Sequence, residues 1–317
     1  MFRPLIVIKR IPRIDFMALH WVGFALSAVL TIGSIVLFLT HGLNYGIDFV
    51  GGTIIEARTS GPADLGKLRA DLDGLGLGEV QLQGFGAPDE VLIRLQRQPG
   101  DDKAQENAVN VVKQKLGDSV QYRRTEVVGP TVGGELIRAG VIATVLALLA
   151  IMLYVWFRFE WQFGVGAMLS TLHDTITTVG LFSLLQIEFN LTTLAAILTI
   201  AGYSINDTVV IYDRVRETMR RHRSMDFRTL INRSLNETLS RTILTVTTVA
   251  LAVLSLLIFG GEVLRGFSIA MLWGIVIGTY SSLFIAAPLL YYIRPKHTGP
   301  AHGSAAEGVV AEPEKVS

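Results

Sequence analysis

Residues 202–217 read GYSINDTVVIYDRVRE, and this stretch indicates the class of fold. Its first half continues an apolar run that begins near Leu191, while its second half ends in closely spaced arginines. A helix of about 20 apolar residues spans the ~30 Å hydrocarbon core of a bilayer. Asp207 lies inside this run. Placing an ionisable group inside a membrane span costs free energy, so such a group is a functional candidate by default. The stretch therefore predicts a transmembrane helix that carries a functional carboxylate and reaches water near Arg214.

The rest of the chain has the composition of an integral membrane protein. Of its 317 residues, 50% are hydrophobic and only 17% are charged, against about 25% charged in soluble domains. The mean hydropathy is +0.46. The absence of cysteine excludes disulfides, iron–sulfur clusters and thiol catalysis. Apolar runs predict six spans, the first an uncleaved helix rather than a signal peptide, over residues 20–40, 138–157, 163–185, 191–212, 242–260 and 267–292.

Basic residues orient these predicted spans. Arginine and lysine gather in the N-terminal arm, between the fourth and fifth spans and after the sixth, whereas the short loops on the other side carry few. By the positive-inside rule both termini lie in the cytoplasm and the long insert lies outside. We expect a cytoplasmic arm, a first span, an outer domain, a bundle of five helices and a disordered cytoplasmic tail, over residues 1–19, 20–40, 41–134, 135–293 and 294–317 respectively.

The insert between the first two spans has a pattern of its own. Strands are predicted over residues 53–59, 80–85, 91–96 and 120–127, and helices over residues 62–75 and 101–116. The order β-α-β-β-α-β is typical of a small ferredoxin-like α+β sandwich. Its sequence contains no phosphate loop, metal cluster or nucleophile–base pair. We therefore expect the insert to act by contact, with no cofactor, no metal and no nucleic acid partner.

Asp207 is the first candidate functional group inside the spans. It lies about 24 Å below the outer entry of its helix at 1.5 Å per residue, and Arg241, which opens the next span, can reach a similar depth. A carboxylate there could bind a proton and exchange it for the guanidinium. Ser204, Asn206 and Thr208 flank it and are candidates for polar support.

Asp174, in the middle of the third span, is a second candidate for a proton path. The alternative for either carboxylate is structural, in which it accepts hydrogen bonds from a neighbouring helix and locks the bundle. For Asp207 the functional interpretation is favoured, whereas for Asp174 the functional and the structural interpretation are kept equally. His173 is more simply a packing residue than a relay, and Asp213 a solvated charge at the membrane surface.

Five segments, in order and with matching spacing, resemble one known family. They are YGIDFVGGT at 45–53, VVGPTVGGEL at 127–136, LHDT at 172–175, GYSINDTVVIYDRVRE at 202–217 and SRTILT at 240–245. Together with the predicted topology they are similar to the SecF family over residues 15–294. Within the insert, residues 60–120 match in pattern more than in residues.

The resemblance implies half of an RND-type transporter in the bacterial inner membrane, with the outer domain in the periplasm. SecD would supply the other half, and the pair would help the SecYEG channel to export unfolded polypeptide by using the proton gradient. It implies proton-path roles for Asp207 and Arg241, with the opposing carboxylate on SecD, and no enzymatic reaction. Membrane lipid is a further expected partner, at the arginine-rich connection.

Two glycine-rich segments where the insert meets the membrane are interpreted as hinge or coupling elements. Glycine permits unusual backbone conformations, and the second segment predicts a non-helical entry to the second span. The residues concerned are Gly46, Asp48, Gly51 and Gly52 in the first segment, and Gly129, Pro130 and Gly133 in the second.

Three other functions compete with this one. A small-molecule RND exporter would carry much larger outer domains. An intramembrane protease would need Asp174 and Asp207 to face each other, but their estimated depths differ by about 7 Å, and the sequence has no GxGD segment. A structural scaffold for the export channel is the third, and only a test of energy coupling separates a scaffold from a motor subunit.

Overall fold

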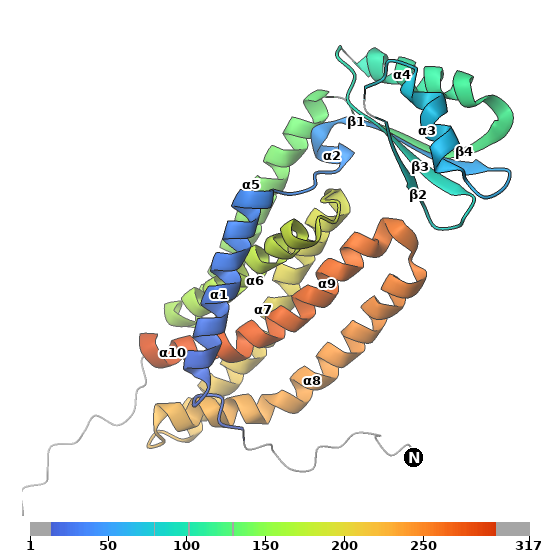
Figure 1. The fold of residues 1–317 in the computed structure, drawn as a ribbon. Helices are drawn as coiled ribbons and strands as arrows, with labels where there is room; N and C mark the ends of the chain where they lie inside the picture. The colour runs from blue at the N-terminus through green and yellow to red at the C-terminus, as the bar shows by residue number, and fades with distance from the viewer. Residues whose placement is uncertain (1–13, 79, 101, 129, 296–317) are drawn as a thin grey trace, which may run out of the picture.

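The structure, a computed structural model, describes residues 14–78, 80–100, 102–128 and 130–295. A bundle of long helices carries a small α+β domain at one end (Figure 1). The chain enters this domain after the first long helix and leaves it into the second. Most of the predicted arm and nearly all of the predicted disordered tail lie outside the described residues.

The bundle is built from helices that overlap the predicted spans. They are α1 (His20–His41), α5 (Pro130–Arg158), α6 (Trp161–Leu185), α7 (Leu191–Arg221), α8 (Phe227–Phe259) and the continuous run of α9 (Gly261–Ser281), η2 (Ser282–Ala286) and α10 (Ala287–Ile293). Five helices in the described part are long and apolar enough to cross a membrane: α1, α5, α7, α8 and the run from α9 to α10. The chain is therefore a multi-pass membrane protein. The 25-residue α6, which is not among the five, carries many buried polar side chains.

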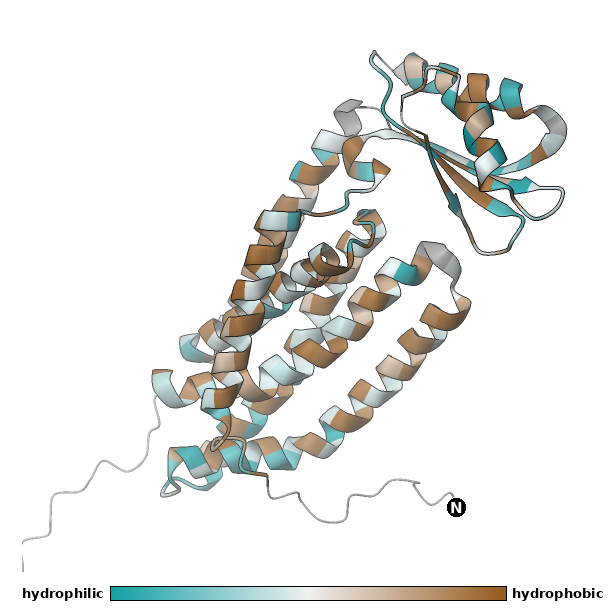
Figure 2. Cartoon of the chain, in the orientation of Figure 1, coloured by the Kyte–Doolittle hydropathy of each residue, from teal (hydrophilic) through white to brown (hydrophobic). Residues whose placement is uncertain are grey.

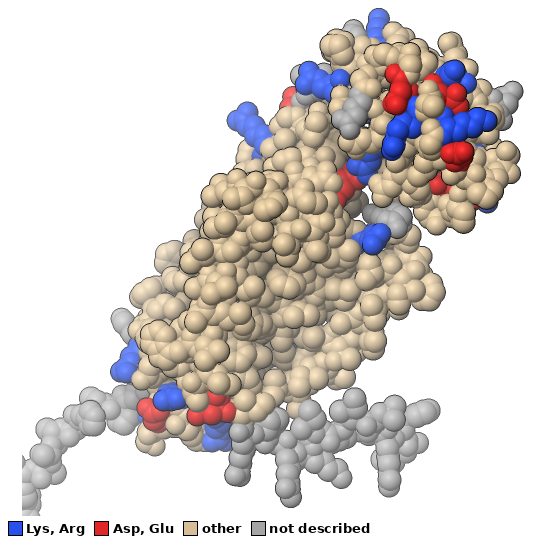
Figure 3. All heavy atoms as spheres, viewed as in Figure 1, with Lys and Arg blue, Asp and Glu red and all other residues tan. Residues whose placement is uncertain are grey.

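The outer surface of the bundle has the character expected in lipid. Only 6% of the apolar window of α5 and 11% of that of α8 is buried inside the chain. Figure 2 shows apolar residues along the outside of α1, α5 and α8. On the face seen in Figure 3, charged side chains gather on the domain and at the opposite end, with an uncharged belt between them. Backbone groups inside such a belt must be satisfied internally, which helices achieve.

Small residues bring the inner helices close together. α6 packs against α1, α5, α7 and α9, and α7 packs against α8 and α9. A Cβ at Gly274 of α9 would collide with Ile200 of α7, and one at Gly166 of α6 would collide with the Tyr212 hydroxyl. Close packing of this kind drives helix association in membranes, where no hydrophobic force acts between helices.

α7 and α8 extend well beyond the predicted spans. Only residues 222–226 join the two helices, where a long connection was predicted. Arg214 pairs with Glu217 and with Glu237 of α8, each at 2.5 Å. Hydropathy marks only the part of a helix that lies in lipid, so the sequence pattern ended α7 too early and began α8 too late.

α5 begins earlier than predicted. It starts at Pro130, so the predicted non-helical entry to the second span is wrong. Proline suits the first helical position, where its missing N–H group has no helical partner to lose. Gly133 is thus a helical residue, and a Cβ there would meet the carbonyl of Phe49. The segment is a helix packed on the short α2 (Ile47–Val50).

The extramembrane domain contains a four-stranded antiparallel sheet in the order β2-β3-β1-β4. Its elements follow the predicted order and are β1 (Gly52–Thr59), α3 (Leu65–Asp73), β2 (Val80–Gly84), β3 (Glu90–Leu95), α4 (Asp102–Leu116), η1 (Gly117–Ser119) and β4 (Val120–Val128). α3 and α4 cover one face of the sheet (Figure 1). Ile55, Leu72 and Ile93 are fully buried in the core between them.

The described chain begins with an elbow that docks on α8. The backbone N–H groups of Ile14 and Met17 donate to the side-chain oxygens of Asn236 and Asn232, both at 2.9 Å. Asn236 Nδ2 donates in turn to the Ile14 carbonyl at 2.8 Å. Phe16 and Met17 are buried. These side chains satisfy backbone groups that precede any helix, and they hold the start of α1 to a distant part of the sequence.

Candidate functional site in the helix bundle

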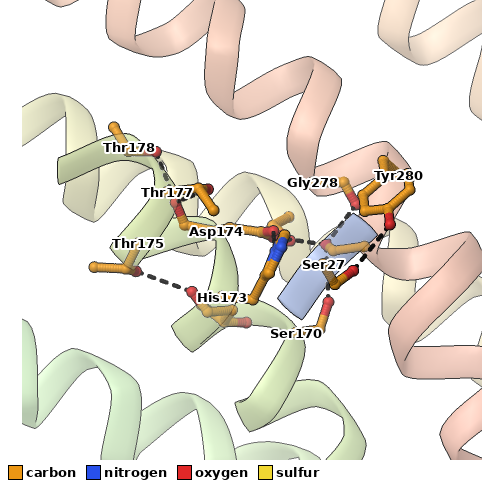
Figure 4. A network of polar contacts seen from close by, with 12 residues as sticks. Ser27, Ser170, His173, Asp174, Thr175, Thr177, Thr178, Gly278 and Tyr280 are labelled. Carbon is orange, nitrogen blue, oxygen red and sulfur yellow. Dashed lines mark hydrogen bonds and ion pairs between the residues drawn. The ribbon is translucent and has the colours of Figure 1, made fainter. Parts of the chain in front are cut away.

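Asp174 lies in the middle of α6 and is completely buried, at 0% exposure. Its Oδ2 accepts hydrogen bonds from Ser204 Oγ of α7 at 2.6 Å and from Ser281 Oγ of α9 at 2.8 Å. His173 Nδ1 lies 3.0 Å from its Oδ1 (Figure 4). Three helices meet at this carboxylate, and both of its oxygens have the partners that buried polar atoms need.

Further hydroxyl groups form hydrogen bonds around Asp174 and between α9 and α1. Ser170 Oγ donates to Ser281 Oγ at 2.9 Å. Tyr280 Oη lies 2.9 Å from Ser27 Oγ and donates to a backbone carbonyl of α1 at 2.6 Å. None of these four hydroxyl groups was predicted. The available signal was their position inside apolar spans, where serine and tyrosine hydroxyls bond across helices.

Asp207 lies about one turn beyond Ser204 on α7 and has a different environment. It is 7% exposed, and its Oδ2 is buried without a hydrogen-bond partner among the described residues. The Tyr203 hydroxyl lies nearby and is buried without a partner among the described residues as well, while the Thr242 hydroxyl of α8 is the polar group that interacts with the carboxylate. Arg241 of α8 acts on Asp207 electrostatically and is itself exposed. Buried oxygens without partners are rare, so this carboxylate retains the capacity to accept a proton.

The structure separates residues that the sequence grouped around Asp207. Ser204 binds Asp174 instead, and Thr208 Oγ1 lies 2.8 Å from Ser282 Oγ. Asn206 is exposed on the outer face of α7. A helix turns once every 3.6 residues, so neighbours in sequence point to different partners.

The segment η2 explains how consecutive serines reach two different helices. It is a π-helix within the last transmembrane run, and such wider turns occur frequently at functional sites. Ser281, just before it, contacts Asp174 of α6, while Ser282, its first residue, contacts Thr208 of α7. Both serines are buried.

The outward face of α7 is lined by small and polar residues. These exposed residues, three or four positions apart, are Thr192, Ala195, Thr199, Gly202 and Asn206. A Cβ at Gly202 would meet open space. Small and polar residues on one face of a membrane helix are typical of contact with another helix rather than with lipid.

The predicted hinge residues lie where the domain joins the bundle. Gly51 and Gly52 have φ angles of 78° and 132°, which favour glycine. Asp48 Oδ2 accepts a hydrogen bond from the N–H of Leu191 at 2.8 Å, and thus binds the start of α7. Gly129 lies outside the described residues. The first segment therefore contains both an unusual backbone and a direct contact with the helix that carries the candidate site.

The chemistry available to these residues is proton binding and ion pairing. Within the described ranges, no group of three or more His, Cys, Asp and Glu side chains could hold a metal ion. Asp213 pairs with Arg158 at 3.3 Å, and its side chain is 61% exposed, as expected of a charge at the membrane surface.

Comparisons with known protein families cover most of the chain. The family model described as "Protein export membrane protein SecD/SecF, C-terminal" matches residues 108–296, and the "SecD/SecF GG Motif" matches residues 36–63. The protein translocase subunit SecF of Rickettsia rickettsii (strain Sheila Smith) is 46% identical over 87% of this chain and 90% of its own length. That of Rickettsia bellii (strain OSU 85-389) is 45% identical over 87% and 92%.

Solved structures of SecDF are similar to this chain as well. The crystal structure of SecDF, a translocon-associated membrane protein from Thermus thermophilus, superposes with a TM-score of 0.79 at 36% identity over 92% of this chain. SecDF in its super-membrane-facing form gives a TM-score of 0.69 at the same identity and coverage. This chain spans 40% of the length of each of those SecDF chains.

Proposed function

The chain belongs to the SecF family of protein translocase subunits, and from this premise we propose that it promotes protein export across a bacterial inner membrane by using the proton-motive force. It acts with SecD and the SecYEG channel on unfolded polypeptide, as a transport subunit rather than an enzyme. Both termini face the cytoplasm and the domain faces the periplasm. The cluster of arginines in residues 214–233, at the end opposite the domain, supports this orientation.

The incomplete environment of Asp207 is the main support for this function. Its buried Oδ2 makes no well-formed hydrogen bond among the described residues, and the groups that act on the carboxylate, Arg241 and Thr242, stand on a different helix. An unpaired charge in lipid is costly. The carboxylate therefore takes either a proton or the guanidinium as its partner, and relative movement of α7 and α8 exchanges one for the other.

SecD is the partner that the outward face of α7 favours. Thr199, Gly202 and Asn206 offer a close-packing surface beside Asp207, and a second helical half seated there would cover Asp207 and Arg241. This half would complete an RND-type assembly. We include α6 as the sixth transmembrane helix, because its 25 residues suffice to span a bilayer and its polar side chains are buried. The sheet order β2-β3-β1-β4, with two helices on one face, supports a ferredoxin-like class for the domain.

The rival functions fit the site less well. A protease would need a water-accessible pair of carboxylates, whereas Asp174 is fully buried and already accepts hydrogen bonds from Ser204 and Ser281. The small domain disfavours a small-molecule exporter. A scaffold is the alternative that shares every other feature, and it differs only in having no use for a titrating carboxylate.

Export of a secreted reporter tests the proposal, in cells whose only copy carries Asp207→Asn. Asparagine keeps the shape of the side chain but cannot exchange a proton as a carboxylate does. We expect export to fall to the level of cells without the chain, at normal protein abundance and normal assembly with SecD. Asp213→Asn, a neighbouring exposed carboxylate on the same helix, serves as the matched control and should export normally. Normal export by Asp207→Asn would instead favour the scaffold.

A further inference from the structure

A cavity of about 680 Å³ separates the open face of the domain sheet from the bundle. One wall is formed by the sheet, where Arg94 of β3 pairs with Ile54 of β1 and with Gln81 of β2 in a single cross-strand row. The opposite wall is formed by the α6–α7 connection, residues 186–190, together with the start of α7 and Arg265 of α9. The domain therefore stands over the bundle with a polar cleft between them.

An ion pair crosses this cleft. Arg94 Nη2 of β3 binds Glu188 Oε2 in the α6–α7 connection, and the two side chains are 22% and 20% exposed. Gly46 makes room for it, because a Cβ there would collide with the Glu188 side chain. Arg94 belongs to the domain sheet and Glu188 to the bundle, so this pair ties the two bodies together.

The segment that enters the domain is fastened to the bundle in a different way. The N–H of Gly46 donates to the Phe189 carbonyl at 2.8 Å, and the N–H of Phe189 donates to the Asn44 carbonyl at 2.7 Å. The rings of Phe49 and Phe189 are stacked with their centroids 5.7 Å apart, and both residues are buried. With the Asp48 contact to α7, these bonds make α2 part of the bundle. Buried aromatic packing of this kind is stronger than a partly exposed ion pair.

The pivot lies between these two fastenings. Gly51 and Gly52 separate the anchored α2 from β1, and both have positive φ angles. Rotation at these glycines moves the sheet while α2 stays on α7 and α5. The Arg94–Glu188 pair is a contact that such a rotation must break, because its two ends lie on opposite sides of the pivot.

We infer that Arg94 and Glu188 form a releasable latch, which holds the domain down over the bundle and opens when the domain pivots about Gly51–Gly52. This inference rests on the proposed function, because it assigns the latch to a domain that moves during export. Glu188 lies three residues before Leu191, the first residue of α7, so the latch also ties the domain to the helix that carries Asp207.

Thiol labelling in membranes measures the latch without reference to export. The chain has no cysteine, so each substitution introduces a single thiol. Ile54→Cys places it on the sheet side of the cleft, and Ala70→Cys places it on the exposed side of α3. With a membrane-impermeant maleimide, we expect Ile54→Cys to react about two- to fivefold faster when Arg94→Gln or Glu188→Gln is added, the range for loss of a partly exposed ion pair.

The charge swap Arg94→Glu with Glu188→Arg should return the labelling rate to that of the parent. Ala70→Cys should react equally in every background, and Asp89→Asn, which breaks an ion pair inside the domain, should leave the rate at Ile54→Cys unchanged. Equal rates at Ile54→Cys in all backgrounds, or no recovery in the swap, would overturn the latch.

A short bis-maleimide linker between Arg94→Cys and Glu188→Cys asks whether the latch must open. We expect linked chains to lose reporter export, while the cysteine-free chain treated with the same linker exports normally. If linked chains export normally and Asp207→Asn does not, the latch is wrong and the proposed function stands. If both export normally, the proposed function itself fails.

Discussion

Asp174 and Asp207 are carboxylates in neighbouring helices, and they differ in their partners more than in their burial. Asp174 is 0% exposed and bonded to residues of α7 and α9, whereas Asp207 is 7% exposed with one oxygen unpartnered among the described residues. A complete set of donors fixes a carboxylate in place. An incomplete set leaves it free to change partner. The comparison therefore favours a bundle-locking role for Asp174 and the moving charge for Asp207.

Removing each carboxylate should give the largest difference. Asp174→Ala leaves the hydroxyls of Ser204 and Ser281 without their acceptor and should cost about 3–5 kcal/mol of stability, the range for breaking a buried polar network. Asp207→Ala removes at most a weak interaction with Thr242 and should cost less than about 1 kcal/mol. Thermal unfolding in detergent and abundance in membranes measure both. Equal losses would show that the two sites do not differ in the way described.

A smaller effect should come from one donor of the Asp174 network. Ser204→Ala removes the 2.6 Å hydrogen bond but leaves Ser281 and His173 in place, so we expect a loss of about 1–2 kcal/mol. Thr199→Ala, on the exposed face of α7, is the matched control and should stay within about 0.5 kcal/mol of the parent. If Ser204→Ala matches the control in unfolding temperature, Asp174 is held by other contacts.

The smallest effect is expected for a paired carboxylate in water. The Arg58 guanidinium donates a hydrogen bond to Asp89 in the domain and holds the pKa of Asp89 below its ordinary value. The folded state thus gains stability above the unfolded pKa of about 4 and loses it as the pH falls through the lower, folded value.

Asp89→Asn should remove that part of the acid sensitivity of the domain. Because both side chains are partly exposed, the change should be slight. Unfolding temperatures of the parent and the variant, measured from pH 7 to pH 3, should converge at the acid end. A constant gap across this range would mean that the pair contributes nothing through ionisation.

The membrane spans, the order of the domain elements and the positions of the two intramembrane carboxylates could be predicted from the sequence for one physical reason. A bilayer imposes a length and an apolar composition, so residues 20–40 were predicted almost as α1 (His20–His41) has them. Alternation in the insert similarly identified β3 at residues 91–96, against Glu90–Leu95. Outside lipid this constraint is lost, and the polar ends of α7 and α8 were therefore missed.

The hydrogen-bond partners of each carboxylate could not be predicted from the sequence in the same way. Ser204 lies three residues from Asp207 in sequence, yet it donates to Asp174 because of how α7 crosses α6. The π-helical η2 brings Ser281 to the same carboxylate, and a single wide turn has no signature in hydropathy. The Arg94–Glu188 pair joins residues 94 positions apart that resemble ordinary surface charges.

The elbow before α1 has a consequence for synthesis of the chain. Its hydrogen bonds join Ile14 to Asn236, which is 222 residues later. At about 5–20 residues per second, the ribosome needs roughly 10–45 s to make the second partner after the first. During that interval α1 has been made, but the α8 residues against which Phe16 and Met17 pack have not. A nascent chain that stalls before α8 would leave Phe16 and Met17 available to chaperones and membrane proteases. The elbow therefore docks only after the chain has been made through α8.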